Sequence, residues 1–187
     1  MFNDEFLLKT LRDENQEKFV IRENVSKENI ETNNGVAVRD DKTNTCALCV
    51  ALNKTVFHNE NKPEYHHPNC KCTNGEFDLQ NVTFDFPLEK ITNYLFVDIN
   101  KKAMMRSMGY VYEDSMMLYG TLQSEIEKKF LVGDYRLNRL DIHGQHFEIT
   151  IRLYGKRDHA NDRFNCHIGC VAWPRGKIKV ATPLIKD

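Results

Sequence analysis

Five thiol and imidazole side chains in the first half of the chain have the spacing of metal ligands. One Cys-x-x-Cys pair is followed after twenty residues by a Cys-x-Cys pair, with a histidine just before it: Cys46, Cys49, His67, Cys70 and Cys72. Thiolate and imidazole are the ligands that Zn²⁺ prefers, and a structural zinc takes four of them in a tetrahedron. The spacing predicts one structural zinc held by four of these five residues. A pair of disulfides is the alternative, but it leaves the histidine unexplained and needs an oxidising compartment.

A second group with chemical potential lies near the C-terminus, on two predicted strands. Apolar and polar residues alternate at 146–153 and again at 163–170, which is typical of strands with one buried face. Facing side chains of an antiparallel pair lie about 4.5 to 5.5 Å apart. The outward positions carry a carboxylate, two imidazoles and two guanidinium groups: Glu148, His146, His167, Arg152 and Arg163.

These side chains are the parts needed to cleave RNA without a metal. Glu148 or a histidine would take the 2′-hydroxyl proton, the other would protonate the leaving oxygen, and Arg152 would neutralise the phosphate. The alternatives are a polar face against solvent, or a surface on which Arg152 and Arg163 bind a partner protein. A catalytic zinc is not expected, because the thiolate-rich cluster has enough ligands to close the coordination shell.

The elements that must position these groups follow from hydrophobic periodicity. Residues 2–20 favour a helix, a short strand is expected at 35–39, and residues 1–84 form the predicted N-terminal module with the zinc. Residues 85–187 form the predicted second domain. Its three helices are expected at 87–95, 100–108 and about 115–130, and its four strands at 135–140, 146–153, 163–170 and 177–182. Short connections predict an antiparallel meander covered by the third helix, hence an α+β fold.

Composition and the absence of certain segments restrict the class of protein. The chain has 187 residues, of which 41% are hydrophobic and 28% charged, as expected for a soluble protein of one or two small domains. No apolar run reaches the roughly 18 residues of a membrane helix, and the first residues lack the pattern of a signal peptide. We therefore expect no membrane partner, a location in the bacterial cytoplasm or a virion, and reduced thiols. Cys166 and Cys170 are expected to be small buried hydrophobic residues.

Charge is distributed unevenly along the chain. Residues 1–84 carry 10 basic and 14 acidic side chains, whereas residues 136–186 carry 10 basic and 4 acidic, a net charge of +6. A local excess of this kind can meet phosphates or an acidic partner surface. Solvated charge on an open sheet face is the alternative.

The region around the cysteines also resembles a known family. Residues 41–49 run Asp-Lys-Thr-Asn-Thr-Cys-Ala-Leu-Cys, residues 52–57 Leu-Asn-Lys-Thr-Val-Phe, and residues 67–72 His-Pro-Asn-Cys-Lys-Cys. This segment resembles the C-terminal metal-binding segment of phage Mu F-type minor head proteins, with Asn53 where glycine is common and Lys71 where arginine is common. The resemblance implies a phage or prophage context, with phage head or neck proteins as partners, and implies no reaction.

The C-terminal half has a second, weaker resemblance. From Lys101 to Leu184 its pattern is similar to that of uncharacterised C-terminal domains of phage and bacterial toxin-like proteins, and helices before a four-stranded antiparallel sheet also characterise barnase-like ribonuclease toxins. Two functions follow as hypotheses. The first is a zinc-binding structural or interaction protein of the minor head type. The alternative is a metal-independent ribonuclease toxin domain carried on the same zinc module, with RNA as the partner.

Overall fold

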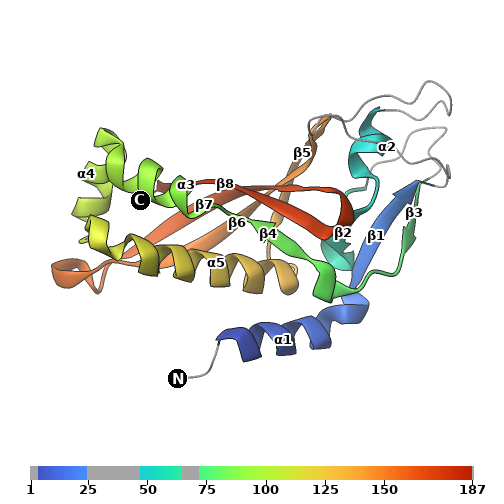
Figure 1. Cartoon of the computed structure of the whole chain (residues 1–187), viewed down its shortest axis with the longest axis horizontal. Coiled ribbons are helices and arrows are strands. Elements are labelled where there is room, and N and C mark those ends of the chain that lie inside the picture. The colour runs from blue at the N-terminus through green and yellow to red at the C-terminus, as the bar shows by residue number, and fades with distance from the viewer. Residues whose placement is uncertain (1–3, 25–46, 65–71, 187) are drawn as a thin grey trace.

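The computed structural model describes residues 4–24, 47–64 and 72–186, and it combines two sheets with a layer of helices (Figure 1). The predicted strand at 35–39 lies outside these ranges. In the part of the chain that the structure describes, no helix is both long and apolar enough to cross a membrane.

The larger sheet has five strands in the order β4-β8-β7-β6-β5. The strands are β4 (Thr83–Asp85), β5 (Arg136–Asp141), β6 (Gly144–Tyr154), β7 (Arg163–Ala172) and β8 (Lys177–Lys186). Strands β5 to β8 form the predicted antiparallel meander. Strand β4 was not among the four predicted strands, although Val82, Phe84 and Phe86 alternate with polar residues around it; it adds in parallel beside β8.

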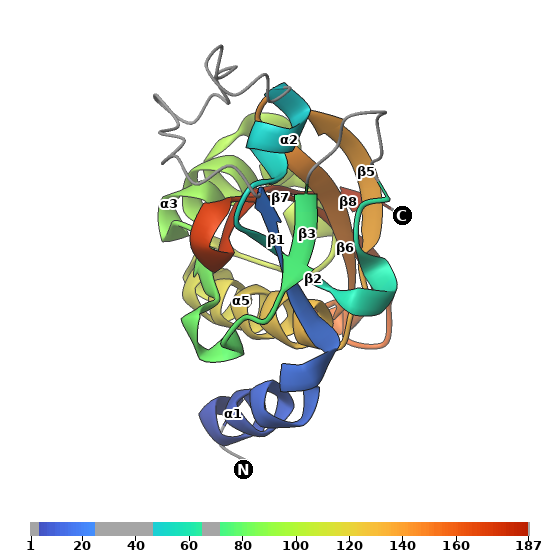
Figure 2. The same ribbon diagram turned by 90° about the vertical axis from the view of Figure 1, so that its right-hand side faces the viewer.

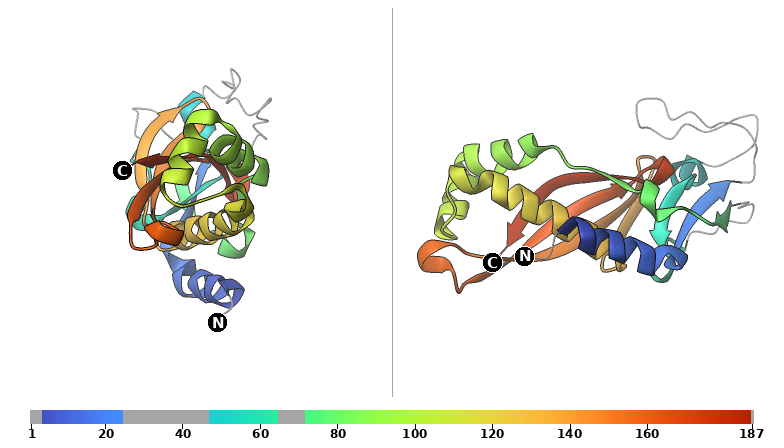
Figure 3. Two further views of the ribbon diagram at one scale, coloured as in Figure 1. Left: turned by 90° about the vertical axis from the view of Figure 1, so that its left-hand side faces the viewer. Right: turned by 60° about the horizontal axis from the view of Figure 1, so that its bottom comes forward.

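Helices cover one face of this sheet (Figure 3). They are α3 (Leu88–Ile91), which continues into the π-helix η4 (Thr92–Val97), α4 (Ile99–Ser107) and α5 (Ser115–Leu131). Helix α5 buries the stripe that its four-residue spacing predicted, from Leu118 to Phe130. These side chains pack in one core with the inward side chains of β6 and β7. The α+β class is therefore confirmed.

The N-terminal part forms a smaller sheet at one end of the molecule and a helix that runs back beneath α5 (Figures 1 and 2). Helix α1 (Asp4–Asn15) lies against α5, and the small sheet has the order β2-β1-β3. Its elements are β1 (Phe19–Asn24), β2 (Thr55–His58), β3 (Cys72–Gly75) and the neighbouring α2 (Ala47–Leu52). The prediction of a helix to residue 20 was too long. Phe19 instead starts β1, where its ring packs 5.2 Å from the His58 ring and 5.4 Å from the Phe130 ring.

Short 3₁₀ helices connect these elements. They are η1 (Gln16–Lys18), η2 (Asn59–Asn61), η3 (Leu79–Asn81), η5 (Tyr112–Asp114), η6 (Arg157–His159) and η7 (Pro174–Gly176).

One buried cluster extends through both sheets and the helices. It includes Phe19 and Phe57 from the N-terminal part as well as Phe130 and Phe147 from the C-terminal part. Strand β4 spans the position of the predicted boundary between residues 84 and 85. The division into two domains stays a prediction, whereas both predicted buried cysteines, Cys166 and Cys170, do lie in this core.

Candidate functional site

The face of the large sheet that points away from the helices carries the predicted polar residues, and we call the outward side chains of β5 to β8 the open face. Along β6 the odd-numbered side chains from Phe147 to Leu153 are buried, while the even-numbered ones from His146 to Tyr154 are partly or fully exposed. Strand β7 alternates in the same way. This alternation confirms the period of two on which the site prediction depends.

Glu148 and His167 meet at the centre of the open face. Thr150 lies directly opposite His167, and Glu148 lies opposite Gly169. His167 Nδ1 is 3.2 Å from Glu148 Oε1 and 3.2 Å from Thr150 Oγ1. The two side chains are 26% and 25% exposed, so solvent and ligands reach both. Among the described residues, no hydrogen-bond partner occupies His167 Nε2, which leaves that nitrogen for a ligand.

The neighbour of Glu148 on β7 has no side chain. Gly169 lies opposite Glu148, and the β7–β8 register shifts beside it, between Ile168 and Cys170. A Cβ placed on Gly169 would have Ala181 Cβ as its nearest neighbour, at 3.7 Å. A glycine and an alanine therefore leave space beside the carboxylate, and this space lets Glu148 lean toward His167.

A β-bulge brings an arginine to the other side of Glu148. Two residues of β5, Asn138 and Arg139, lie opposite the single residue His146 of β6. The register therefore shifts between Leu137 and Leu140. Without the bulge, the tight turn would pair Leu137 with Glu148. With it, Arg136 faces Glu148, and Arg136 Nη2 lies 3.5 Å from Glu148 Oε1.

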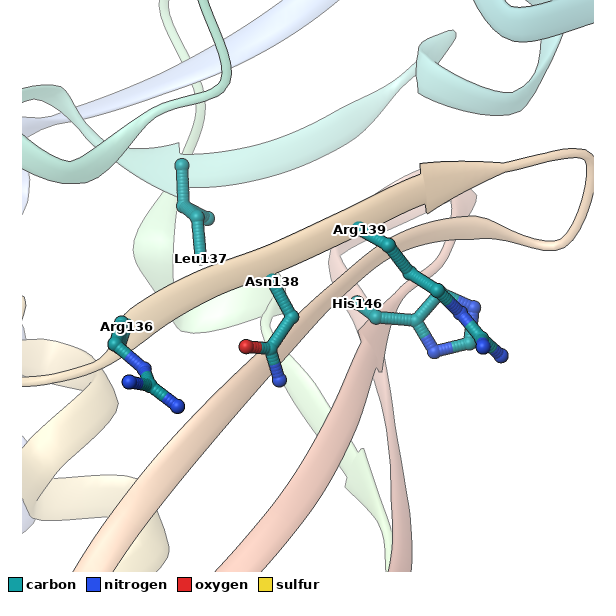
Figure 4. A pocket seen from close by; sticks show the side chains of 5 residues that line it. All are labelled: Arg136, Leu137, Asn138, Arg139 and His146. Atoms are coloured by element: carbon teal, nitrogen blue, oxygen red, sulfur yellow. The ribbon is translucent and has the colours of Figure 1, made fainter.

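The bulge also forms a shallow depression at the edge of the sheet. Figure 4 shows Arg136, Asn138, Arg139 and His146 projecting to one side of the sheet, with Leu137 pointing away from them. Bulges of this kind are frequent beside functional sites because they redirect side chains.

His146, which was predicted to join the catalytic group, has a different partner. Its Nε2 lies 3.1 Å from Asp141 Oδ2, and Arg139 Nε lies 3.1 Å from the same oxygen. Partial burial acts to raise the pKa of Asp141, but hydrogen bonds from the His143 backbone N–H and from His146, with the charge of Arg139, lower it below its usual range. His146 therefore belongs to a separate ion cluster at the bulge.

The two predicted binding arginines lie further along the open face. Arg152 is opposite Asn165 and forms no ion pair or hydrogen bond within the described ranges. Arg163 is opposite Tyr154, and its guanidinium carbon lies 5.6 Å from the centre of the Tyr154 ring. Both arginines are exposed and keep their positive charge available to a ligand.

The structure describes two of the five predicted zinc ligands. Cys46, His67 and Cys70 lie outside the described residues, Cys72 begins β3 opposite Asn24, and Cys49 is buried in α2. Both α2 and β3 lie at the small-sheet end of the molecule (Figures 1 and 2). The described side chains alone form no group of three or more metal-binding residues. The donor set fits zinc by its chemistry, because four thiols and an imidazole exceed what one tetrahedral site needs.

Sequence reasoning missed two side chains that contact the Glu148–His167 pair, Thr150 and Arg136. Thr150 could have been found, because the alternation alone places it on the outward side of β6 beside Glu148. Arg136 could not, because simple pairing from the turn puts Leu137 in its place and only the bulge reverses this.

Comparisons with protein-family models, curated proteins and solved structures found no match to this chain.

Proposed function

We propose that the large sheet is a metal-independent ribonuclease, carried beside a phage-derived zinc-binding segment. The observation that supports this most directly is the pairing of Glu148 with His167 in a partly exposed position. A carboxylate and an imidazole 3.2 Å apart can move protons between themselves and a substrate. Arg136 lies beside Glu148 on one side of the pair, and Arg152 and Arg163 lie further along the open face on the other side.

The reaction assigned to this pair is an internal transfer that needs no co-reactant. Glu148 accepts the proton of a ribose 2′-hydroxyl, whose oxygen attacks the adjacent phosphorus and forms the new P–O bond. The bond from phosphorus to the 5′-oxygen breaks, and protonated His167 donates its Nε2 proton to that leaving oxygen. The products are a 2′,3′-cyclic phosphate and a 5′-hydroxyl end, so atoms and charges balance.

The other members of the group prepare this step. Thr150 and Glu148 both engage His167 Nδ1, which orients the ring and leaves Nε2 as the atom that meets the substrate. Arg136 is 76% exposed at its side chain and can turn from Glu148 to a phosphate oxygen. A permanent positive charge beside the phosphate stabilises the negative charge that develops on it in the transition state.

The test is cleavage of a single-stranded RNA by the full-length, zinc-loaded protein in buffer without added Mg²⁺. We expect Glu148→Gln and His167→Ala each to lower the rate by at least about 10², while the circular dichroism spectrum stays unchanged. A substrate with 2′-deoxyribose at the cleaved position should be inert, because it lacks the nucleophile.

Two exposed residues elsewhere provide matched controls. Glu14→Gln on α1 and His143→Ala in the β5–β6 turn make the same chemical changes away from the pair and should cleave at the wild-type rate. A rate that is equal in all four variants, or products without a cyclic phosphate, would overturn the assignment.

The zinc is a separate part of the proposal. We expect one equivalent per chain in protein purified without added zinc, held by four of Cys46, Cys49, His67, Cys70 and Cys72. Zinc binding would then contribute to folding of this segment. Elemental analysis and thiol titration test it. Well under one equivalent, with these cysteines in disulfides, would contradict it.

A second candidate function uses the same face without chemistry. The net charge of +6 over residues 136–186 favours binding of an acidic surface, and the resemblance of the cysteine segment implies an interaction protein of the phage minor head type, located in a virion or the bacterial cytoplasm. Its partner would be an acidic surface of a head or neck protein. Here Glu148→Gln should matter little, whereas reversing Arg152 and Arg163 to glutamate should abolish association with purified head or neck proteins.

A further inference from the structure

The far end of the open face carries an aromatic ring that the proposed reaction does not use. Tyr154 is the last residue of β6, and 56% of it is exposed. The guanidinium of Arg163 lies over its ring, 5.6 Å from the ring centre. Exposed aromatic rings beside arginine are the surfaces on which proteins stack unpaired bases.

This ring lies in line with the Glu148–His167 pair. Along β6 the outward side chains run from Glu148 through Thr150 and Arg152 to Tyr154. Successive outward positions on a strand are about 7 Å apart, so Tyr154 is about 14 Å beyond the Thr150–His167 row. Arg152 stands between them and has no partner among the described residues. A single-stranded RNA that follows this row can place a phosphate at Arg152 and an unpaired base on the Tyr154 ring.

The backbone under the ring is held firmly. The Tyr110 hydroxyl donates a 2.6 Å hydrogen bond to the Tyr154 carbonyl, and Lys156 N donates a 2.9 Å bond to the Met108 carbonyl. Burial, followed by the nearby Asp114 charge, raises the pKa of Tyr110, so its hydroxyl keeps this proton. A stacking ring on a fixed backbone loses little further freedom when a base binds.

We infer that Tyr154 and Arg163 form a base-stacking site for single-stranded RNA, with Arg152 holding a phosphate between this site and the Glu148–His167 pair. The inference rests on the proposed ribonuclease function, because cleavage at the Glu148–His167 pair requires the RNA strand to run from that pair toward Tyr154. Single-stranded RNA fits better than duplex, because a base in a duplex is already stacked on both sides and cannot lie on the tyrosine ring. It fits better than a protein surface, because acidic side chains would use the arginines and leave the exposed ring idle.

The test is binding of a fluorescently labelled, uncleavable 2′-O-methyl RNA oligonucleotide to the full-length protein, followed by anisotropy. We expect Tyr154→Ala to weaken binding about tenfold, which lies within the range of single-base stacking. Tyr154→Phe should bind almost as well as the wild type, because the ring is kept. Tyr112→Ala is the matched control: Tyr112 is also 56% exposed, but it lies in η5, and the variant should bind normally.

Three further arms decide what the ring recognises. Polyphosphate, which has charge but no bases, should bind Tyr154→Ala and wild type equally, and duplex RNA should bind more weakly than single-stranded RNA. Equal losses for RNA and polyphosphate would overturn stacking, as would RNA binding that is absent in the wild type or unaffected by Tyr154→Ala. So would a requirement for Tyr154 in binding to a head or neck protein but not to RNA.

The two proposals fail separately in these measurements. If the protein binds RNA through Tyr154 but never cleaves it, the ribonuclease assignment is wrong and the stacking site stands. If cleavage depends on Glu148 while Tyr154→Ala binds and cleaves like the wild type, only the stacking site is wrong.

Discussion

Strand β6 connects two clusters of charged residues that use their charges differently. The first, which we call the anchor cluster, consists of Asp114, Lys156 and Arg157 at the end of β6. The Asp114 carboxylate accepts hydrogen bonds from the Val111 backbone N–H at 2.9 Å, from Lys156 Nζ at 3.0 Å and from Arg157 Nη1 at 2.9 Å. Arg157 also donates to the Gly109 carbonyl. Each charge in this cluster therefore has an opposite charge or a backbone group against it.

The central pair of the open face is less fully bonded. Glu148 has His167 at 3.2 Å and Arg136 at 3.5 Å, and both contacts use the same oxygen, Oε1. Asp114 is only 12% exposed, whereas Glu148 is 26% exposed. The partners of Asp114 include a backbone donor, but those of Glu148 are all side chains that can rotate away.

The difference indicates what each cluster is for. The Asp114 carboxylate, which is mostly buried and accepts from a backbone N–H, holds the loop after β6 to the start of α5. The Glu148 carboxylate is 26% exposed and bonded only to side chains, and a pair of this kind contributes little to stability and can exchange its partners for a ligand. We therefore assign the anchor cluster a structural role and propose that the open face binds a ligand.

The largest expected effect on stability comes from breaking the anchor cluster. Asp114→Ala removes three hydrogen bonds and leaves Lys156 without its opposite charge. We expect the free energy of unfolding to fall by about 2 to 3 kcal/mol. Urea denaturation measures this change.

Asp158→Ala is the control for that variant. Asp158 is in the same loop, is exposed and has no bonded partner within the described ranges, so its loss should change the free energy of unfolding by less than about 0.5 kcal/mol. Equal effects of the two substitutions would remove the distinction between the clusters.

The pH dependence of stability sharpens the same comparison. The backbone N–H of Val111 holds the pKa of Asp114 well below its usual range; desolvation opposes this, and hydrogen bonds from Arg157 and Lys156 reinforce it. A carboxyl group whose pKa is lowered by folding stabilises the fold above its unfolded pKa of about 3.9 and loses that contribution as pH falls toward its folded pKa. The stability difference between wild type and Asp114→Asn should therefore be constant near neutral pH and shrink below about pH 4.

Asp141 also has a lowered pKa, but it is present in both proteins, so its contribution cancels in that difference. A stability difference that grows as the pH falls would show that Asp114 is not ionised in the native protein.

Much of this arrangement was predictable from local pattern. The four-residue stripe of α5 and the alternation of β6 and β7 each repeat several times, so packing confirms what the periodicity predicts. The facing of Glu148 toward His167 follows from that alternation and from the short β6–β7 connection. Long, regular elements leave one choice of buried face, and the side chains on the other face follow from it.

The rest depends on irregularities and on distant contacts. The bulge that brings Arg136 to Glu148 leaves no periodic signal, and the alternation from Val82 to Phe86 does not reveal that β4 pairs in parallel with the distant β8. Asp114 and Lys156 are 42 residues apart, and nothing in either segment indicates their contact. The helix prediction to residue 20 failed because burial of Phe19 outweighed local helix propensity.

A smaller effect on stability is expected for the central pair. Glu148→Gln removes a partly exposed ion pair, and exposed pairs contribute about 0 to 1 kcal/mol. We expect the free energy of unfolding to fall by less than about 1 kcal/mol, in the same variant that loses cleavage. Urea denaturation beside Asp114→Ala measures both. A loss as large as that of Asp114→Ala would place Glu148 in the structural class instead.

The smallest effect on stability is expected for Arg152, an open-face residue that belongs to neither the anchor cluster nor the central pair. Arg152→Gln keeps most of the side-chain stem and removes a charge that has no partner in the described part of the protein, so the free energy of unfolding should change by less than about 0.5 kcal/mol. Its binding of single-stranded RNA should nevertheless weaken, because one phosphate contact is lost. Plots of the logarithm of affinity against that of salt concentration should become shallower by about 0.7. Arg106→Gln on α4 changes another exposed arginine, away from the open face, and should leave that slope as it is. An unchanged slope for Arg152→Gln would mean that this charge contacts no phosphate.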